Sequence, residues 1–293
     1  MKILVPVKQI GVVDEDFELR DDGKDVDPDF LNFEANEWDD YSYEAALQIM
    51  EATDGVEVVP VTVGPDDAED VLRRCLAKGG ERGIRVWDDA LEDAGPAAIV
   101  QVLAKVVEKE QPDMVFVGTL SSDRSYAQTG VGLAAALGWP HAAVITGIEW
   151  KPGDPKATLL RELEGGLVEQ LSVNCPAVLT IQLGINTPRY ASLRGVKQAK
   201  ERPVEELSLS DLGLSGDDLA AAGGSFRVRR MYKPETGQAE LIEGTPAEQA
   251  ARLAEIINEL KGAACWVRFS LLQSIGRANS TRPRWKRSLP QWI

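Results

Sequence analysis

Short apolar runs alternate with amphipathic segments in the first part of the chain, and this alternation restricts the possible folds more than any other feature. Four runs are rich in valine and isoleucine: Ile3–Val7, Val56–Gly64, Gly83–Trp87 and Asp113–Gly118. The segment Gly95–Glu110, between two of these runs, repeats its apolar residues at helical spacing. Buried strands that alternate with helices predict an α/β fold with a doubly wound, mostly parallel sheet.

The next part of the chain has a different pattern. After Pro140, four strand-like segments follow one another with turns but no helices between them. They are Ala142–Trp150, Ala157–Leu163, Leu167–Val173 and Ala177–Gln182. Successive strands without intervening helices predict antiparallel additions at an edge of the sheet.

The C-terminal part of the chain divides into an arm and a tail. We expect an α/β domain over 1–212, then a linker and a helical arm over 213–262. Thr245 and Glu248 form a capping box that predicts the start of the arm helix, and Gly262 predicts its end. The helix has an apolar stripe that must be buried. Because a linker precedes the helix, we expect the stripe to pack against a partner chain. This stripe consists of Leu253, Ile256, Ile257 and Leu260.

The tail over 263–293 contains six basic residues, three tryptophans and no acidic residue. Two interpretations remain open: a contact with a membrane surface or a nucleic acid, or an extension without a role in the fold. The residues in question are Arg268, Arg277, Arg282, Arg284, Lys286, Arg287, Trp266, Trp285 and Trp292.

Charge and cysteine content exclude several classes of protein. The 32 basic and 47 acidic residues give a net charge of −15, which disfavours binding to nucleic acid. Cys75, Cys175 and Cys265 lie far apart and His141 is the single histidine, so neither a metal site nor a disulfide framework is expected. The sequence shows no signal peptide and no apolar run of about 20 residues. We therefore expect a cytoplasmic protein.

The loop Gly118–Gly130 is the strongest candidate for a binding site. It joins a predicted strand to a predicted helix, the position where parallel α/β sheets bind their ligands. The helix beginning near Gln128 would direct free N–H groups at the loop, where Arg124, Ser125 and Thr129 add donors suited to a phosphate. The alternative is that the polar side chains of the loop only cap the helix.

Two further features fall at the same predicted edge. The segment Asn36–Asp39 begins another helix, and Val61–Pro65 ends a strand in a sharp turn. Asn36 or Asp39 could be a helix cap, and Trp38 could belong to the core. Together with the loop, these features outline a pocket along one edge of the sheet.

At these residues the chain resembles the β subunits of electron transfer flavoproteins, over about residues 1–262. The segments that carry the resemblance are MKILVPVKQI, NEWDDYSYEAAL, VTVGP, GTLSSDRSYAQTG, NCPAVLTI and, most specifically, NTPRYASLRGVKQAK. The arm also resembles the C-terminal helix of the family, which packs on the α subunit.

The resemblance implies a heterodimer in which the α subunit binds the redox-active FAD and the β subunit binds AMP. In electron-bifurcating members, a second FAD replaces the AMP. Thr129, where the FAD type has valine, favours AMP because it would crowd a second diphosphate. The resemblance places the nucleotide contacts at Pro6, Asn36, Glu37, Trp38, Asp39, Val63, Gly118, Thr119, Leu120, Ser121, Ser122, Asp123, Arg124, Ser125, Tyr126, Ala127, Gln128 and Thr129.

A second implied site is a docking loop for acyl-CoA dehydrogenases or similar electron donors. Leu193 would be its apolar anchor, surrounded by Arg189, Arg194, Lys197 and Lys200, which would steer the encounter. The alternative is an ordinary surface loop with an exposed leucine.

The function that follows is electron carriage from such dehydrogenases to a quinone-linked membrane oxidoreductase, with no catalytic residue in this chain. One alternative is the β subunit of a bifurcating flavoprotein with a second FAD. Another is a nucleotide-binding sensor of the same fold, which would have no use for the Leu193 loop or the arm. An adenylating enzyme is a third, but it would need a Gly/Ser-rich loop directly after the first strand.

Overall fold

The computed structural model describes residues 1–14, 16–92, 94–221, 228–233 and 241–277, with the backbone alone for 221 and 262–277. Its internal contacts divide the chain into two compact units, 1–232 and 233–293. The basic and tryptophan side chains that the sequence analysis assigned to the tail lie outside the described residues.

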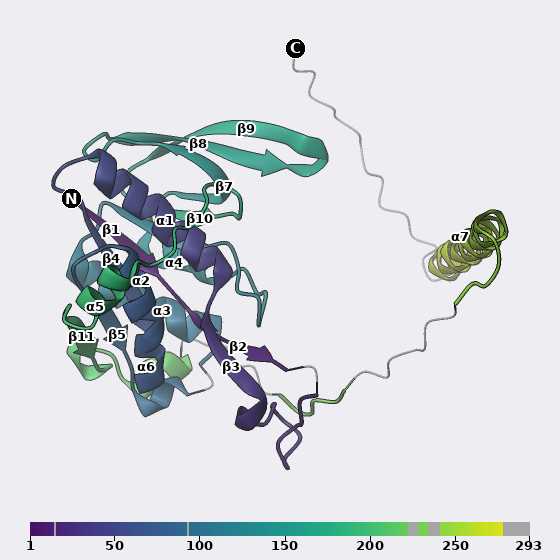
Figure 1. Cartoon of the computed structure of the whole chain (residues 1–293), viewed down its shortest axis with the longest axis horizontal. Coiled ribbons are helices and arrows are strands. Elements are labelled where there is room, and N and C mark those ends of the chain that lie inside the picture. Colours follow the sequence, from purple (N-terminus) through teal and green to yellow (C-terminus); the bar gives the residue numbers. More distant parts are fainter. Residues whose placement is uncertain (15, 93, 222–227, 234–240, 278–293) are drawn as a thin grey trace. The chain divides into compact units, whose positions relative to one another are not determined.

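The first unit is built on a nine-stranded sheet, shown in Figure 1. The seven strands from β11 to β7 in spatial order are parallel, which confirms the predicted doubly wound α/β class. The spatial order is β11 (Val204–Leu207), β5 (Gly83–Val86), β4 (Glu57–Val63), β1 (Lys2–Pro6), β6 (Met114–Gly118), β10 (Ala177–Ile181), β7 (His141–Glu149), β8 (Lys156–Leu163) and β9 (Leu167–Asn174). Two more strands, β2 (Gln9–Val13) and β3 (Leu31–Ala35), form a separate antiparallel ribbon.

Helices cover both faces of the sheet. One face carries α1 (Glu37–Ala52) and α2 (Glu69–Lys78), with α5 (Leu193–Ala199) packed on α2. The other face carries α3 (Pro96–Glu110), α4 (Thr129–Leu137) and α6 (Gly216–Ala221). Short 3₁₀ helices lie at Pro28–Phe30, Asp66–Ala68, Asp89–Leu91, Glu164–Gly166 and Ser210–Leu212.

The central strands are buried on both sides, as their continuous apolar runs predict. In β1, Ile3 and Val5 pack into the core under α1, whereas Leu4 points into the core under α3 and α4. Successive side chains of a strand point to opposite faces, so a strand between two helical layers needs apolar residues at every position. Leu219 of α6 is also buried, so packing with this unit continues beyond residue 212.

The prediction of antiparallel strands is correct for β8 and β9, correct for only one side of β7, which pairs antiparallel with β8, and wrong for β10. β8 and β9 are antiparallel additions at the edge of the sheet. β7 is parallel to β10, and β10 lies between β6 and β7. All five residues of β10 are buried, the burial expected of a central parallel strand rather than an edge strand.

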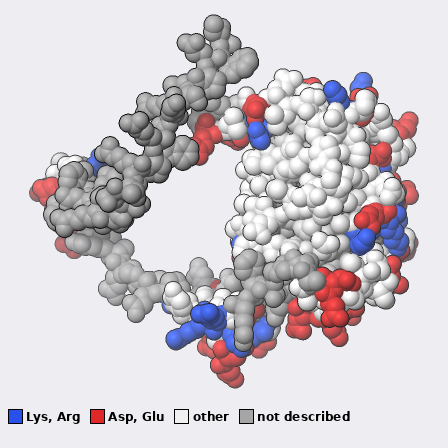
Figure 2. All heavy atoms as spheres, turned by 180° about the vertical axis from the view of Figure 1, so that it is seen from behind, with Lys and Arg blue, Asp and Glu red and all other residues white. Residues whose placement is uncertain are grey.

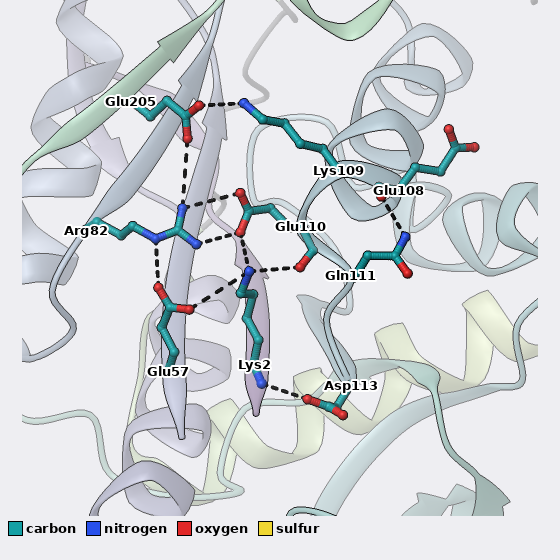
Figure 3. Close-up of polar contacts among 9 residues, drawn as sticks. All are labelled: Lys2, Glu57, Arg82, Glu108, Lys109, Glu110, Gln111, Asp113 and Glu205. Carbon is teal, nitrogen blue, oxygen red and sulfur yellow. Dashed lines mark hydrogen bonds and ion pairs between the residues drawn. The ribbon is translucent and has the colours of Figure 1, made fainter. Parts of the chain in front are cut away.

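Charged side chains join the strands at the amino edge of the sheet (Figure 3). Glu110, at the end of α3, accepts hydrogen bonds from Lys2 Nζ at 2.6 Å and from Arg82 Nη2 at 2.5 Å. Arg82 Nε also donates to Glu57 at 2.7 Å, and the backbone N–H of Lys2 donates to Asp113 at 2.7 Å. These contacts tie the starts of β1 and β4 to the end of α3.

The second unit contains α7 (Pro246–Arg277). The predicted capping box is confirmed, because the backbone N–H and hydroxyl of Thr245 each donate to Glu248 at 2.8 Å. The prediction that Gly262 ends the helix is wrong. A glycine inside a helix costs only about 1 kcal/mol, and the next two residues, Ala263 and Ala264, are strong helix formers.

Candidate functional site

The carboxyl ends of β1 and β6 meet where the chain changes direction across the sheet. From β1 the chain adds β4 and β5 on one side, and then crosses back to place β6 on the other side of β1. Ligands of parallel α/β sheets bind outside the carboxyl ends of the strands at such a switch point. The predicted site residues Pro6, Val63 and Gly118 end β1, β4 and β6, so all three lie at this edge.

Gly118 ends β6 in close contact with the first turn of α1. Its N–H donates to Asp39 Oδ1 at 3.1 Å. A Cβ atom on Gly118 would lie 2.3 Å from that oxygen and 2.8 Å from Trp38 Cβ, so only glycine fits here. The next residue, Thr119, donates its N–H and its hydroxyl to Ile181 O at 3.0 and 2.8 Å. The loop therefore leaves the sheet at a fixed point between β10 and α1.

Asn36, directly before α1, holds the loop against that helix. Its Nδ2 donates to Leu120 O at 2.9 Å, and its Oδ1 accepts from Ser122 N–H at 3.3 Å. Its backbone N–H donates to Lys8 O at 2.9 Å. The Asn36 side chain does not cap α1. It connects the start of that helix with the loop instead.

Asp39 joins the two strands that border the switch point. Its Oδ2 accepts the Lys8 N–H at 2.8 Å, and its Oδ1 accepts the Gly118 N–H. Asp39 is buried, and this burial raises the pKa of its carboxyl from 3.8 to about 7 in spite of the two hydrogen bonds. Asp39 therefore fixes β1 and β6 at the point where the loop begins.

Helix α4 begins at Thr129 without a side-chain cap within the described residues. Its N-cap residue, Gln128, accepts the first helical hydrogen bond from Gly132 N–H, but its side chain makes no capping bond. Ser125 and Ala127 adopt positive φ angles of 52° and 51°, a conformation that costs energy in residues other than glycine. The polar side chains of the loop therefore do not cap α4, and the capping alternative is wrong. The free N–H groups and the positive dipole end of the helix suit an anion.

The donor set at this edge fits a phosphate group. Ser122, Arg124 and Ser125 lie in the exposed part of the loop. Sequence reasoning did not assign a role to Lys8, whose Nζ lies 2.7 and 2.6 Å from the two carboxylate oxygens of Asp123. Its position directly after the first apolar run was the available signal. The site thus combines hydroxyl, cationic and backbone donors with one loop carboxylate.

The remaining predicted contacts occupy the same edge. Glu37 is exposed, whereas Trp38 is half-buried and donates its indole N–H to Gln182 Oε1 at 3.0 Å. The predicted residues Thr119 to Gln128 make up the loop itself. The structure therefore brings the end of β1, the start of α1, the end of β4 and the loop after β6 together at one edge.

The loop before α5 and the first residue of that helix present apolar side chains to solvent. Tyr190 is 98% exposed and Leu193 88% exposed. Arg189 does not belong to the ring of free charges that we expected around Leu193, because it donates to Glu44 at 2.8 and 2.9 Å and also pairs with Glu51. Arg194, Lys197 and Lys200 are exposed, as the docking interpretation requires.

Among the described residues, no group of three or more histidine, cysteine, aspartate or glutamate side chains is arranged to hold a metal ion. The described helices also include none that is long and apolar enough to cross a membrane.

The fold and this edge define a doubly wound α/β protein of the class whose ligands bind at the carboxyl ends of the strands. A family model for the electron transfer flavoprotein domain matches residues 29–212. The chain belongs to the electron transfer flavoprotein family and is similar to its β subunits over most of its length.

Three relatives show the extent of this similarity. The electron transfer flavoprotein subunit beta of Methylophilus methylotrophus is 58% identical over 264 residues, which cover 90% of this chain and 100% of that protein. The subunit of Bradyrhizobium diazoefficiens is 36% identical over 90% of this chain and 99% of its own length. The subunit of Mus musculus is 33% identical over 87% of this chain and 98% of its own length.

Proposed function

We propose that this chain is the β subunit of a heterodimeric electron transfer flavoprotein and binds AMP at the carboxyl edge of its sheet. The complex would carry electrons from acyl-CoA-type dehydrogenases to a quinone-linked membrane oxidoreductase. The observation that carries the proposal is the uncapped start of α4, which faces a loop that Asn36 holds in place. A helix start with free N–H groups is a ready site for a phosphate.

The chain's own residues would bind and orient the nucleotide. The first turn of α4 and the hydroxyls of Ser122 and Ser125 would hold the phosphate, while Asn36 and Asp39 keep the surrounding segments in place. FAD bound by the α subunit would supply the redox chemistry of the complex. No residue of this chain would act as an acid, a base or a nucleophile.

Two surfaces support pairing with an α subunit. The run from Ser125 to Ile148, which includes α4 and all of β7 except its last residue, contains no aspartate, glutamate, lysine or arginine. Figure 2 shows a broad area without charged side chains on the face of the molecule that it presents. In the second unit, Leu253, Ile257 and Leu260 of α7 are exposed in this single chain. Apolar and uncharged surfaces of this kind are typical of protein interfaces.

The exposed loop at Leu193 would dock the electron donor. Its base is held in place, because Arg189 pairs with the buried carboxylate of Glu44 on α1. On the other side, a Cβ atom on Gly195 would lie 2.1 Å from Ala77 O, so the chain packs directly on α2. A loop with two fixed ends loses little entropy when its exposed leucine is buried by a partner.

The nucleotide content of the purified complex tests the proposal. Co-expression with the α subunit should give a yellow heterodimer that releases one FAD and one AMP on acid treatment. Asn36→Ala should lower the AMP content and keep the FAD, whereas the exposed Asn32→Ala should change neither. Two FAD per heterodimer would indicate the bifurcating alternative, and a colourless homodimer that binds ATP would indicate the sensor.

A second measurement tests the docking loop. Leu193→Ala should leave the cofactor content unchanged and slow the reduction of the complex by an acyl-CoA dehydrogenase. The expected loss is about tenfold, because burial of one leucine side chain contributes roughly 1.5–3 kcal/mol. An unchanged rate of reduction would reject the docking role.

A further inference from the structure

The ammonium of Lys8 and the carboxylate of Asp123 face each other across the switch point. Lys8 follows β1 and Asp123 lies in the loop after β6, with Nζ to carboxylate distances of 2.7 and 2.6 Å. Lys8 Nζ also lies 3.4 Å from Ser121 Oγ in the same loop. The Lys8 side chain is 43% exposed and the Asp123 side chain 19% exposed, so solvent and a ligand can still reach the lysine.

Two hydrogen bonds hold the backbone of Lys8 just after the end of β1, whereas its side chain reaches across to the loop. Its N–H donates to the buried Asp39 at 2.8 Å, and its carbonyl accepts from Asn36 N–H at 2.9 Å. The side chain therefore starts from a rigid point at the edge of the site. Only its far end would need to move to meet a different anion.

Asp123 is an unusual residue for a loop that would receive a phosphate. Burial alone would raise the pKa of its carboxyl, but hydrogen bonds from Lys8 and Ser121 hold that pKa below its usual range. The Asp123 side chain therefore carries a negative charge at neutral pH. Such a charge repels a phosphate dianion and at the same time occupies the cation that would attract it.

We propose that Lys8 and Asp123 together determine how tightly this site holds the phosphate of its nucleotide, with Lys8 favouring the phosphate and Asp123 competing for Lys8. This inference rests on the proposed nucleotide site. Lys8 acts as a specificity-determining cation and Asp123 as an internal competitor. A nucleotide phosphate would take over part of the lysine's hydrogen bonding, and no other segment needs to rearrange.

A purely structural role for the pair makes a different prediction. If the ion pair only fastened the loop, removing either partner would loosen the whole site. Binding of AMP and binding of adenosine, which lacks the phosphate, would then weaken together. If the pair acts on the phosphate, the two substitutions change the Kd for AMP in opposite directions and leave the Kd for adenosine unchanged.

The test is calorimetric titration of AMP and of adenosine into the full heterodimer freed of bound nucleotide. Lys8→Gln should raise the Kd for AMP about tenfold, and Asp123→Asn should lower it, since a charged hydrogen bond to phosphate is lost or gained. The double variant should lie close to the unmodified protein, and Lys8→Arg should restore binding. Lys24→Gln removes a surface lysine that lies 3.7 Å from Asp22 and serves as the matched control.

The titrations distinguish failure of the Lys8–Asp123 role from failure of the nucleotide site itself. Weaker AMP binding by Asp123→Asn would overturn the proposed role of the pair in phosphate binding. Weaker adenosine binding by either variant, in parallel with AMP, would overturn it as well. If the unmodified heterodimer binds AMP and the variants show the expected order, the inference is confirmed. If the unmodified heterodimer binds neither AMP nor adenosine, the proposed nucleotide site itself is rejected.

Discussion

Replacement of Asp39 by asparagine tests whether burial controls the charge at the base of the site. The Asp39 residue is 4% exposed, and its carboxyl accepts the N–H groups of Lys8 and Gly118. Asparagine has nearly the same shape and keeps one accepting oxygen, but it cannot ionise. The substitution therefore removes the titration and leaves most of the packing in place.

The expected effect is a change in the pH dependence of folding stability. Burial raises the pKa of Asp39 to about 7 in the folded chain, against 3.8 as its ordinary value. Between these two values the folded state holds a proton that the unfolded state has released. The stability that Asp39 contributes is therefore highest below pH 3.8, falls as the pH rises to 7 and then levels off. Between about pH 5 and pH 8 the loss is about 2.5 kcal/mol, at about 1.4 kcal/mol for each full pH unit.

Urea unfolding, followed by tryptophan fluorescence at the two pH values, measures this effect. The free energy of unfolding of Asp39→Asn should gain about 2.5 kcal/mol relative to the unmodified chain as the pH rises. The neighbouring Asp40, which pairs with Lys78 at 2.6 Å, provides the control, and Asp40→Asn should differ from the unmodified chain equally at both pH values. A constant difference for Asp39→Asn would refute the argument, because the buried carboxyl would then already be ionised in the folded chain at the lower pH.

Two further substitutions test the packing at opposite edges of the sheet. Gly118→Ala should destabilise the fold by about 3 kcal/mol in thermal unfolding, because the new Cβ would meet Asp39 Oδ1. Gly138→Ala, at a φ of 65° with no atom within 4 Å, should cost only about 1 kcal/mol, and equal costs would contradict the contact. Glu110→Gln should cost about 2 kcal/mol at neutral pH. Burial raises the pKa of Glu110, but hydrogen bonds from Arg82 and Lys2 hold it below 4.5. The advantage of the unmodified chain should therefore persist above pH 4.5 and shrink in more acidic urea titrations, and an advantage independent of pH would contradict this.

The parallel core was predictable because its signal is local. Each central strand is a continuous apolar run, and each long helix has its own apolar stripe, so the elements can be identified one at a time. The position of β10 was not predictable in this way. Its pairing with β6 and β7 joins segments far apart in the chain, and its sequence is equally compatible with the hairpin that precedes it.

The candidate site was also only partly predictable, because some of its contacts join segments that are far apart in the chain. The loop from Gly118 to Thr129 was identifiable from its composition and from the strand and helix on either side. The role of Asn36 was not, because a residue at the start of a helix is as suited to capping as to a contact with a distant loop. Its bonds to Leu120 and Ser122 are visible only once the strands are ordered. The pairing of Lys8 with Asp123 depends on the same ordering.

The charged side chains at the two edges of the sheet are arranged in opposite ways. At the amino edge, the carboxylate of Glu110 is 7% exposed and lies between Lys2 and Arg82, so the charges there satisfy one another. At the carboxyl edge, α4 begins without a cap and Lys8 remains 43% exposed. A chain with a net charge of −15 repels a phosphate at long range, so it can bind one only where such donors are close together. Lys8 and Asp123 lie at that edge, with Asp123 in the loop that leads into α4. Removing Asp123 would therefore change the balance of charge beside the start of α4, where we propose that the phosphate binds.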